Sequence, residues 1–428
     1  MSQYSGYAND SLEFLKKHKV GVGDTVEVMA DTAYAGIIMP RYEHGDDRHI
    51  VLKLTSGYNV GLRIEEIRDV TKMQDVEKQV KRPAITRHAD GLPKILLLST
   101  GGTIASSIDY RTGAVTPVLS AEELVASVPE LAGIANIEAE QILSEYSENI
   151  VPKHWVLIAE KISTYAESGY SGIIVAHGTD TMHYTSAFLS FALAGFPIPV
   201  VLVGSQRSSD RASSDAALNL IGAASFISQC KTNGVYVAMH RDENDEEIAC
   251  HIGTRVRKNH TSKRGAFQTI GSDPAFIVAN GHVCKMMPDR FFRTDIFEPR
   301  IKMEPKIMLV KYHPGLDPRL LDSMVDIGCR GIIFEGTGLG HVGRTAYESI
   351  RNAVKKGVFI GMTSQCMDGR VSMTVYESGR DLLNMGIVPL EDMMPEVALV
   401  KAMWAFGNFG DEEARRIMLE NVASEMSG

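Results

Sequence analysis

The sequence predicts an α/β protein with a large doubly wound parallel sheet, a smaller α/β domain after it and a small β-barrel-like domain before it. Continuous apolar runs at 94–100, 171–177 and 197–204 alternate with helical sequence, which is typical of buried parallel strands. A second such alternation follows residue 305. Short strand-like runs separated by Gly, Asp and Pro fill 22–67 and predict a small barrel or sheet.

The N-terminal part begins with a predicted short helix over 11–18, followed by the β-rich stretch. A charged segment that ends in KRPAITRHADGLPK reads as a linker. Further on, helices are expected over 181–194, after the second apolar run, and as a pair over 395–425. These observations divide the chain into a β-rich domain, a linker, a large α/β domain, a connector and a smaller α/β domain, at 1–70, 71–92, 93–287, 288–305 and 306–428.

Composition narrows the class of protein. The chain has 428 residues and a formal net charge of -9, so it does not bind nucleic acid through bulk charge. No apolar run is long enough to span a membrane, and the N-terminus has no apolar signal core. Five widely spaced cysteines without a CxxC pair indicate reduced thiols. We therefore expect a cytoplasmic protein.

The motif TGGTIA at 100–105 follows the first apolar run. Ligands of open α/β sheets bind at the carboxyl ends of the strands, and two glycines let the backbone turn tightly and approach a ligand. Thr103 places a hydroxyl directly after the glycines. A Gly-Gly pair alone equally fits a plain turn between strand and loop, and the motif is not the GxGxxG of dinucleotide sites.

Two further segments carry candidate chemistry. HGTDT at 177–181 also follows an apolar run, where a carboxylate beside a hydroxyl can activate a nucleophile, bind a cation or cap a helix. His177 itself is more typical of a structural histidine than of a base. The basic run at 254–264 is usual for a solvated face, and charge alone does not single out a catalytic lysine in it.

Together these motifs resemble the bacterial-type asparaginase and glutaminase family, over about residues 94–425. The order TGGTIA, HGTDTM, VLVGSQR and RVRKNHTSKRGAF carries the resemblance. It implies an asparaginase-like fold, with Thr103 as the catalytic nucleophile. It also implies that Thr179, Asp180 and Lys258 are the second catalytic threonine, the aspartate and the lysine.

The same resemblance implies the substrate-binding residues. Ser147 and Glu148 match the family's substrate-binding pair, and Tyr110 looks like its mobile-loop tyrosine. Ser205 belongs to a segment that lines the amide end of the substrate. Backbone N–H groups near Gly102 would stabilise the oxyanion. No metal or other cofactor is implied in this chain.

The implied reaction is hydrolysis of a side-chain amide through an acyl-threonine. A threonine hydroxyl is a poor nucleophile until a base accepts its proton, and lysine acts as a base only when burial or a nearby cation lowers its pKa. Arg257, next to Lys258, is a candidate for such a cation. Thr179 would relay the proton, while Asp180 would orient Lys258 or pair with the α-ammonium of the substrate.

The extra N-terminal sequence distinguishes one branch of the family. Ordinary members begin close to the TGGT motif, whereas 93 residues precede the Lys94 strand here. That extension and the SIDY sequence at 107–110 resemble the D subunits of archaeal glutamyl-tRNA(Gln) amidotransferases. The resemblance implies a homodimer with a partner, the E subunit, which binds ATP, Mg²⁺ and most of the tRNA(Gln). This chain would supply it with ammonia from glutamine or asparagine.

Two other functions fit parts of the sequence. A stand-alone cytosolic L-asparaginase would share the catalytic core, and only residues 1–92 argue against it. A binding module that keeps the fold as a non-catalytic scaffold is disfavoured, because all four catalytic positions hold chemically competent residues.

Overall fold

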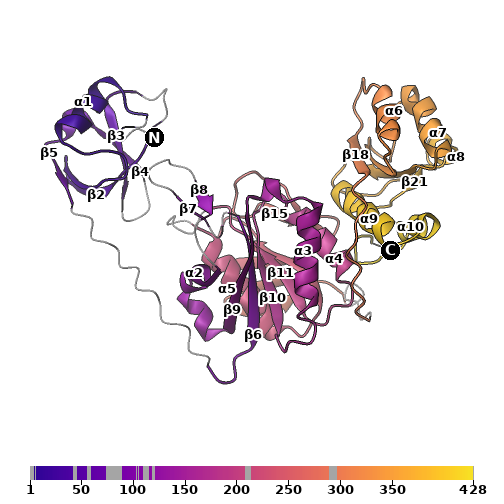
Figure 1. The fold of residues 1–428 in the computed structure, drawn as a ribbon, viewed down its shortest axis with the longest axis horizontal. Coiled ribbons are helices and arrows are strands. Elements are labelled where there is room, and N and C mark those ends of the chain that lie inside the picture. Colours follow the sequence, from indigo (N-terminus) through magenta and orange to yellow (C-terminus); the bar gives the residue numbers. More distant parts are fainter. Residues whose placement is uncertain are drawn as a thin grey trace.

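A computed structural model shows three folded parts (Figure 1). It describes residues 4, 6–41, 46–54, 59–73, 89–102, 104, 106–108, 115–117, 121–207, 214–288 and 296–427. Two of the predicted site residues, Thr103 and Tyr110, lie outside the described residues. Within these ranges no helix is long and apolar enough to cross a membrane.

The N-terminal part is a five-stranded antiparallel sheet with one helix, α1 (Asn9–Lys17). Its strand order is β4-β3-β2-β1-β5. Side chains alternate between core and solvent along β1, because successive strand residues point to opposite faces: Val26 and Val28 are buried, whereas Glu27 and Met29 are exposed. The strands are β1 (Thr25–Met29), β2 (Ala33–Ile38), β3 (His49–Leu54), β4 (Asn59–Arg63) and β5 (Asp69–Lys72).

An eight-stranded sheet forms the centre of the large α/β domain, in the order β17-β16-β13-β12-β11-β10-β6-β9. The five strands from β12 to β9 run parallel, and the other three add an antiparallel edge. The strands are β6 (Lys94–Gly101), β9 (Asn136–Glu145), β10 (Gly172–Ala176), β11 (Pro199–Val203), β12 (Gly234–His240), β13 (Glu247–Ile252), β16 (Phe276–Ala279) and β17 (His282–Lys285). Two hairpins lie outside this sheet, β7 (Ser106–Ile108) with β8 (Val115–Pro117), and β14 (Val256–Lys258) with β15 (Phe267–Thr269).

Helices cover both faces of this sheet. Successive residues of β6 point to opposite sides, so Leu96 and Leu98 enter one core while Ile95 and Leu97 enter the other. The first core is closed by α3 (Pro152–Ser163), α4 (Met182–Ala192) and α9 (Pro395–Asn408), and the second by α2 (Ala121–Ala126) and α5 (Ala216–Gln229). Burial on both faces explains why the central strands read as continuous apolar runs.

The C-terminal domain has a parallel sheet in the order β18-β19-β20-β21. One face packs on α6, α7 and α8, and its core includes Phe334. Residues of the opposite face, such as Ile333 and Phe359, share a core with α9 and the large sheet. Helix α9 thus joins the two domains, and Figure 1 shows it between α4 and the C-terminal sheet. The elements are β18 (Ile307–Lys311), α6 (Arg319–Asp326), β19 (Gly331–Gly336), α7 (Tyr347–Lys355), β20 (Phe359–Ser364), α8 (Glu377–Asn384), β21 (Val388–Pro389) and α10 (Asp411–Ile417).

The predicted fold class is confirmed: an α/β protein with an antiparallel β-rich N-terminal part. The expected helices over 11–18 and 181–194 correspond to α1 and α4, and the expected C-terminal pair corresponds to α9 and α10. The antiparallel edge of the large sheet was not predicted. The predicted domain boundaries stay predictions.

A buried ion pair fastens the end of the chain to α9. Lys401 Nζ lies 2.6 Å from Glu425 Oε1, and both side chains are fully buried. The same carboxylate accepts the backbone N–H groups of Val422 and Ala423, at 2.9 and 2.6 Å. Residues 422–425 therefore fold around the buried negative charge of Glu425, and Lys401 compensates that charge.

We expect Lys401→Ala to lower the free energy of unfolding by roughly 3–5 kcal/mol, because it leaves Glu425 buried and uncompensated. Urea denaturation followed by tryptophan fluorescence measures this, since Trp404 lies in the same helix. The double variant Lys401→Met with Glu425→Gln removes both charges and is expected to be more stable than Lys401→Ala. A double variant as unstable as the single one would contradict this explanation.

Candidate active site

The ends of β6, β10 and β11 bring three of the predicted motifs together. The hydroxyl of Thr100 donates a hydrogen bond to the carbonyl of Ala176 (2.9 Å), which joins the ends of the first two strands. The backbone N–H of His177 donates to the carbonyl of Val203 (2.9 Å), which joins the second strand to the third. The candidate site therefore lies at the carboxyl ends of adjacent parallel strands, as expected for an open α/β sheet.

Gly102 approaches the second motif more closely than any other residue type allows. Its φ is +82°, and a Cβ there would lie 2.4 Å from the backbone nitrogen of Gly178. Gly101 has a φ of +98°, and a Cβ there would lie 2.7 Å from the nitrogen of Glu145. Both glycines are thus required by backbone conformation and by space. Position 103 follows this contact directly, and position 179 follows Gly178.

The predicted substrate-binding segment packs against the same turn. Ser147 begins the 3₁₀ helix η4 (Ser147–Asn149) and is buried. A Cβ at Gly178 would lie 2.7 Å from the Cβ of Ser147. The hydroxyl of Thr181 donates to the carbonyl of Ser147 (2.6 Å). Ser147 is therefore fixed at the site, whereas Glu148 beside it is exposed to solvent.

Lys258 meets both predicted partners from the second motif. Its ammonium donates to Thr179 Oγ1 (2.8 Å) and to Asp180 Oδ1 (2.6 Å). The Lys258 side chain is only 9% exposed, whereas that of Asp180 is 66% exposed. These three side chains come from positions 79 and 78 residues apart in the chain. The arrangement links a hydroxyl to an amine, as a proton relay requires, with the open carboxylate at its outer end.

Helix α4 begins without using Thr179 or Asp180 as its cap. The N-cap residue is Thr181, which makes no side-chain cap hydrogen bond. Its hydroxyl is used for Ser147 instead. The helix-capping interpretation of the second motif is therefore wrong. Thr179 and Asp180 contact Lys258.

Ser205 lies next to the relay and is buried. A Cβ at the preceding Gly204 would lie 2.8 Å from Thr179 Cγ2, so the segment after β11 touches the second motif. The hydroxyl of Ser205 is buried and has no hydrogen-bond partner. An unpaired buried hydroxyl costs free energy, which fits a group held for a substrate.

A polar network, missed in the sequence, holds the segment after β11. Asp215 accepts the backbone N–H groups of Gln206 (3.0 Å) and Arg207 (3.1 Å). Asn219, one turn further along α5, donates to the carbonyl of Gly204 (3.0 Å), and His240 Nδ1 lies 2.6 Å from its Oδ1. The signal available in the sequence was Asn219, the one amide side chain inside the largely apolar run 216–227.

His177 is a structural histidine, as expected. It is fully buried, with Nδ1 2.7 Å from the carbonyl of Gly178 and Nε2 2.9 Å from Thr185 Oγ1. The ring is therefore neutral, with Nδ1–H donating to the carbonyl and Nε2 accepting from the hydroxyl. Burial lowers the pKa of His177 from 6.5 to about 4.

Of the predicted site residues, the structure brings Gly102, Ser147, Thr179, Asp180 and Lys258 to one place, with Ser205 beside them. Among the described residues, no group of three or more His, Cys, Asp or Glu side chains is placed to hold a metal ion. The catalytic and substrate-binding roles of these residues stay predictions.

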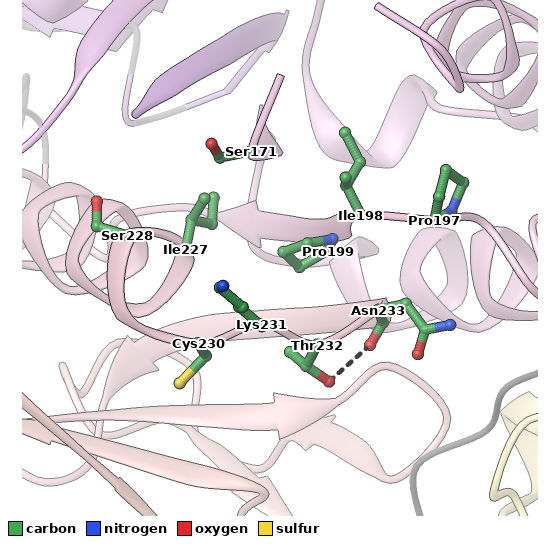
Figure 2. A pocket seen from close by; sticks show the side chains of 10 residues that line it. All are labelled: Ser171, Pro197, Ile198, Pro199, Ile227, Ser228, Cys230, Lys231, Thr232 and Asn233. Carbon is green, nitrogen blue, oxygen red and sulfur yellow. Dashed lines mark hydrogen bonds between the residues drawn. The ribbon is translucent and has the colours of Figure 1, made fainter. Parts of the chain in front are cut away.

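A depression at the opposite end of the sheet is a separate feature (Figure 2). It has a volume of about 580 Å³ and lies at the amino ends of β10, β11 and β12. Pro197, Ile198 and Pro199 are apolar residues that line it, and Lys231 is the charged residue among those that line it. The Thr232 hydroxyl donates to the carbonyl of Asn233 (3.3 Å). The predicted site residues lie at the other end of the strands.

Comparison with known proteins identifies the family. The glutamyl-tRNA(Gln) amidotransferase D subunit of Metallosphaera sedula is 45% identical over 425 residues, which cover 98% of this chain and 96% of that protein. The D subunits of Pyrococcus abyssi and Methanopyrus kandleri are also 45% identical, over 97% and 100% of this chain and 97% and 96% of their own.

This chain belongs to the family of glutamyl-tRNA(Gln) amidotransferase D subunits.

Family models match each part of this amidotransferase chain. The model "Asparaginase, N-terminal" matches residues 94–288, "Glutaminase/Asparaginase C-terminal domain" matches 306–419 and "GatD N-terminal domain" matches 20–73. Among solved structures, the thermostable L-asparaginase of Thermococcus kodakarensis is similar with a TM-score of 0.70 and 35% identity, over 78% of this chain and 99% of its own. L-asparaginase I of Vibrio cholerae shares the fold with a TM-score of 0.69 and 24% identity, over 79% of this chain and 100% of its own.

Buried histidines make the free energy of unfolding depend on pH. Burial lowers the pKa of His183 and His251 to about 4 and about 3, beside His177 at about 4. As pH falls through 6.5, the unfolded chain takes up protons that the folded chain refuses, so the free energy of unfolding falls. His177 alone contributes a loss of roughly 2 kcal/mol between pH 7 and 5.

We expect His177→Gln to flatten this dependence by up to about one proton, as measured by urea denaturation between pH 7 and 5. Replacement of an exposed histidine, His282→Gln, serves as the matched control. An unchanged slope in His177→Gln would show that His177 is not held neutral.

Proposed function

We propose that this chain releases ammonia from glutamine or asparagine through an acyl intermediate on Thr103, and that an ATP-dependent partner uses the ammonia to convert Glu-tRNA(Gln) to Gln-tRNA(Gln). The observation that carries the chemistry is the contact of Lys258 with Thr179 and Asp180. Family membership carries the rest, because the curated relatives are D subunits of glutamyl-tRNA(Gln) amidotransferases across nearly their whole length.

In the proposed reaction, neutral Lys258 takes a proton from the Thr103 hydroxyl through Thr179. The Thr103 oxygen then attacks the side-chain amide carbon of the substrate, and the carbonyl oxygen becomes an oxyanion. When that intermediate collapses, the carbon–nitrogen bond breaks, and the nitrogen leaves as ammonia with the proton from Lys258. Water then attacks the acyl-threonine by the same route, so the free acid leaves and Thr103 recovers its proton.

Backbone geometry supports an oxyanion site beside Gly102. The close approach of Gly102 to Gly178 places two peptide backbones side by side where position 103 and Thr179 follow. N–H groups held rigidly in this way stabilise charge that develops in the transition state, and loss of one such donor typically costs about 10²–10³ in rate. Ser147 and Ser205 would bind the substrate there, together with Glu148 and Tyr110.

Membership in a family of amidotransferase subunits implies that this chain works with at least one partner. We further propose that the partner is the E subunit of the amidotransferase, that it binds ATP, Mg²⁺ and most of the tRNA(Gln), and that this chain forms a homodimer. The absence of a GxxxxGK[ST] loop from the sequence and the net charge of -9 support this division of labour. The cytoplasm, where tRNA is aminoacylated, is the proposed location, and this chain needs no cofactor of its own in the proposal.

Hydrolysis of free asparagine is the second candidate function. The similarity to a solved L-asparaginase over 78% of this chain favours it. The N-terminal match at 20–73 and the full-length similarity to the D subunits favour the tRNA-linked function. A non-catalytic scaffold is disfavoured, because the amine–hydroxyl–carboxylate contact is intact.

Dependence on tRNA separates the two enzymatic functions. We expect ammonia release from glutamine by the co-purified complex to be slow alone and to rise at least about tenfold when glutamyl-tRNA(Gln) is present. An assay of ammonia with glutamyl-tRNA(Gln), and with a non-cognate aminoacyl-tRNA as the control, measures this. Full turnover of free asparagine by this chain without partner or tRNA would favour the L-asparaginase function.

Substitution tests the catalytic assignment. We expect Thr103→Val and Lys258→Ala each to lower ammonia release by at least roughly a thousandfold, because one removes the nucleophile and the other removes its base. Thr103→Ser keeps a hydroxyl and should keep measurable activity. Lys263→Ala removes an exposed lysine from the same basic run and should leave activity unchanged. Normal turnover in Thr103→Val would refute the nucleophile assignment.

A further inference from the structure

The strand that presents Lys258 is held by the C-terminal domain. β14 (Val256–Lys258) is three residues long and pairs only with β15 within the part of the chain that the structure describes. It therefore lacks the support that the eight-stranded sheet gives to the glycine motifs. Both residues that flank Val256 make ion pairs with the C-terminal domain, Arg255 with Asp392 just before α9 and Arg257 with Glu396 in its first turn.

Arg257 pairs with the first turn of α9. Its Nε lies 2.9 Å from Glu396 Oε1, and the Glu396 side chain is only 8% exposed. The other carboxylate oxygen of Glu396 is buried without a hydrogen-bond partner. A guanidinium N–H of Arg257 also donates to the sulfur of Met367 (2.9 Å). A buried carboxylate of the C-terminal domain is thus held by the residue next to Lys258.

A second ion pair holds the start of the same strand. Arg255 is almost fully buried, with Nη1 2.9 Å from Asp392 Oδ2. Its Nε donates to the carbonyl of Ser424 (2.7 Å), and the hydroxyl of Thr254 donates to the carbonyl of Ala423 (2.7 Å). The strand is therefore fixed at both ends by residues 392–396 and by the end of the chain.

We propose that Glu396 is a positioning residue for amide hydrolysis, which sets the place and the charge balance of Lys258 through its ion pair with Arg257. This inference rests on the proposed role of Lys258 as the base. It also changes the expected role of Arg257, because its positive charge is balanced by Glu396. A shift of the C-terminal domain would move Glu396, Arg257 and Lys258 together.

The charges near Lys258 predict the direction in which the pH profile shifts when Glu396 is replaced. Asp180 contacts the ammonium directly, Arg257 is its neighbour in the strand, and Glu396 faces Arg257 from α9. His183 and Tyr184 face the same charges from α4, and burial keeps both neutral, with the pKa of His183 lowered to about 4 and that of Tyr184 raised. Removal of the negative charge at position 396 therefore leaves the positive charge of Arg257 unbalanced beside Lys258.

The test is Glu396→Gln in the full chain, co-purified with its partner and assayed for ammonia release with glutamyl-tRNA(Gln). We expect kcat to fall roughly tenfold or more with little change in KM, because β14 loses its anchor. We also expect the acid limb of the kcat profile to move to lower pH by on the order of half a unit or more, because Arg257 is left unbalanced. The double variant Arg257→Gln with Glu396→Gln should return the limb to its original pH.

Glu391→Gln is the matched control, because Glu391 lies shortly before Glu396 in the chain but pairs with Arg370. If Glu396→Gln behaves like Glu391→Gln while Lys258→Ala is inactive, the positioning role is wrong and the proposed function stands. If Lys258→Ala is fully active, the proposed function itself fails. Should Glu396→Gln not fold, Glu396→Asp keeps the charge on a shorter side chain, and kcat equal to that of Glu391→Asp would overturn the proposal.

Discussion

The backbone contact between Gly102 and Gly178 is the constraint on which the candidate site depends. Neither position tolerates a side chain: a Cβ at Gly102 would meet the Gly178 backbone, and a Cβ at Gly178 would meet Ser147. Two strand ends and the segment at Ser147, the predicted substrate-binding segment, therefore lie in direct contact. Thr179 follows Gly178 directly, so its place is set by this backbone packing.

The strand ends at this site could be predicted from the sequence, because the patterns that mark them are local. Apolar runs that end in Gly-Gly or His-Gly mark buried strands whose carboxyl ends share one edge. Lys258 could not be distinguished by charge within the basic run at 254–264, and only the resemblance to a family selected it. The antiparallel edge strands β13, β16 and β17 were missed, since short apolar runs do not reveal strand direction.

The interactions that hold the candidate site could also not be predicted from the sequence, because the partners lie far apart in the chain. Arg257 was a candidate for a cation that acts on Lys258, and the structure pairs it with Glu396, 139 positions further along the chain by their numbering. Arg255 and Asp392 are 137 positions apart. Such partners depend on how α9 packs between two sheets, which no local pattern encodes. Asn219 was the exception, because a polar residue inside an apolar helix is itself a signal.

Two basic side chains lie near the end of β10: His177 follows the strand, and Lys258 contacts Thr179. They differ in their hydrogen-bond partners and in how open those partners are to solvent. His177 is fully buried, and burial lowers its pKa to about 4, so the ring stays neutral near neutral pH. Lys258 has its ammonium bonded to a hydroxyl and to a carboxylate that is open to solvent. The hydroxyl can reverse its role from acceptor to donor, so loss of a proton from Lys258 requires no change in the backbone. A base must change its charge in every turnover, and of these two groups only Lys258 lies beside a carboxylate that is open to solvent.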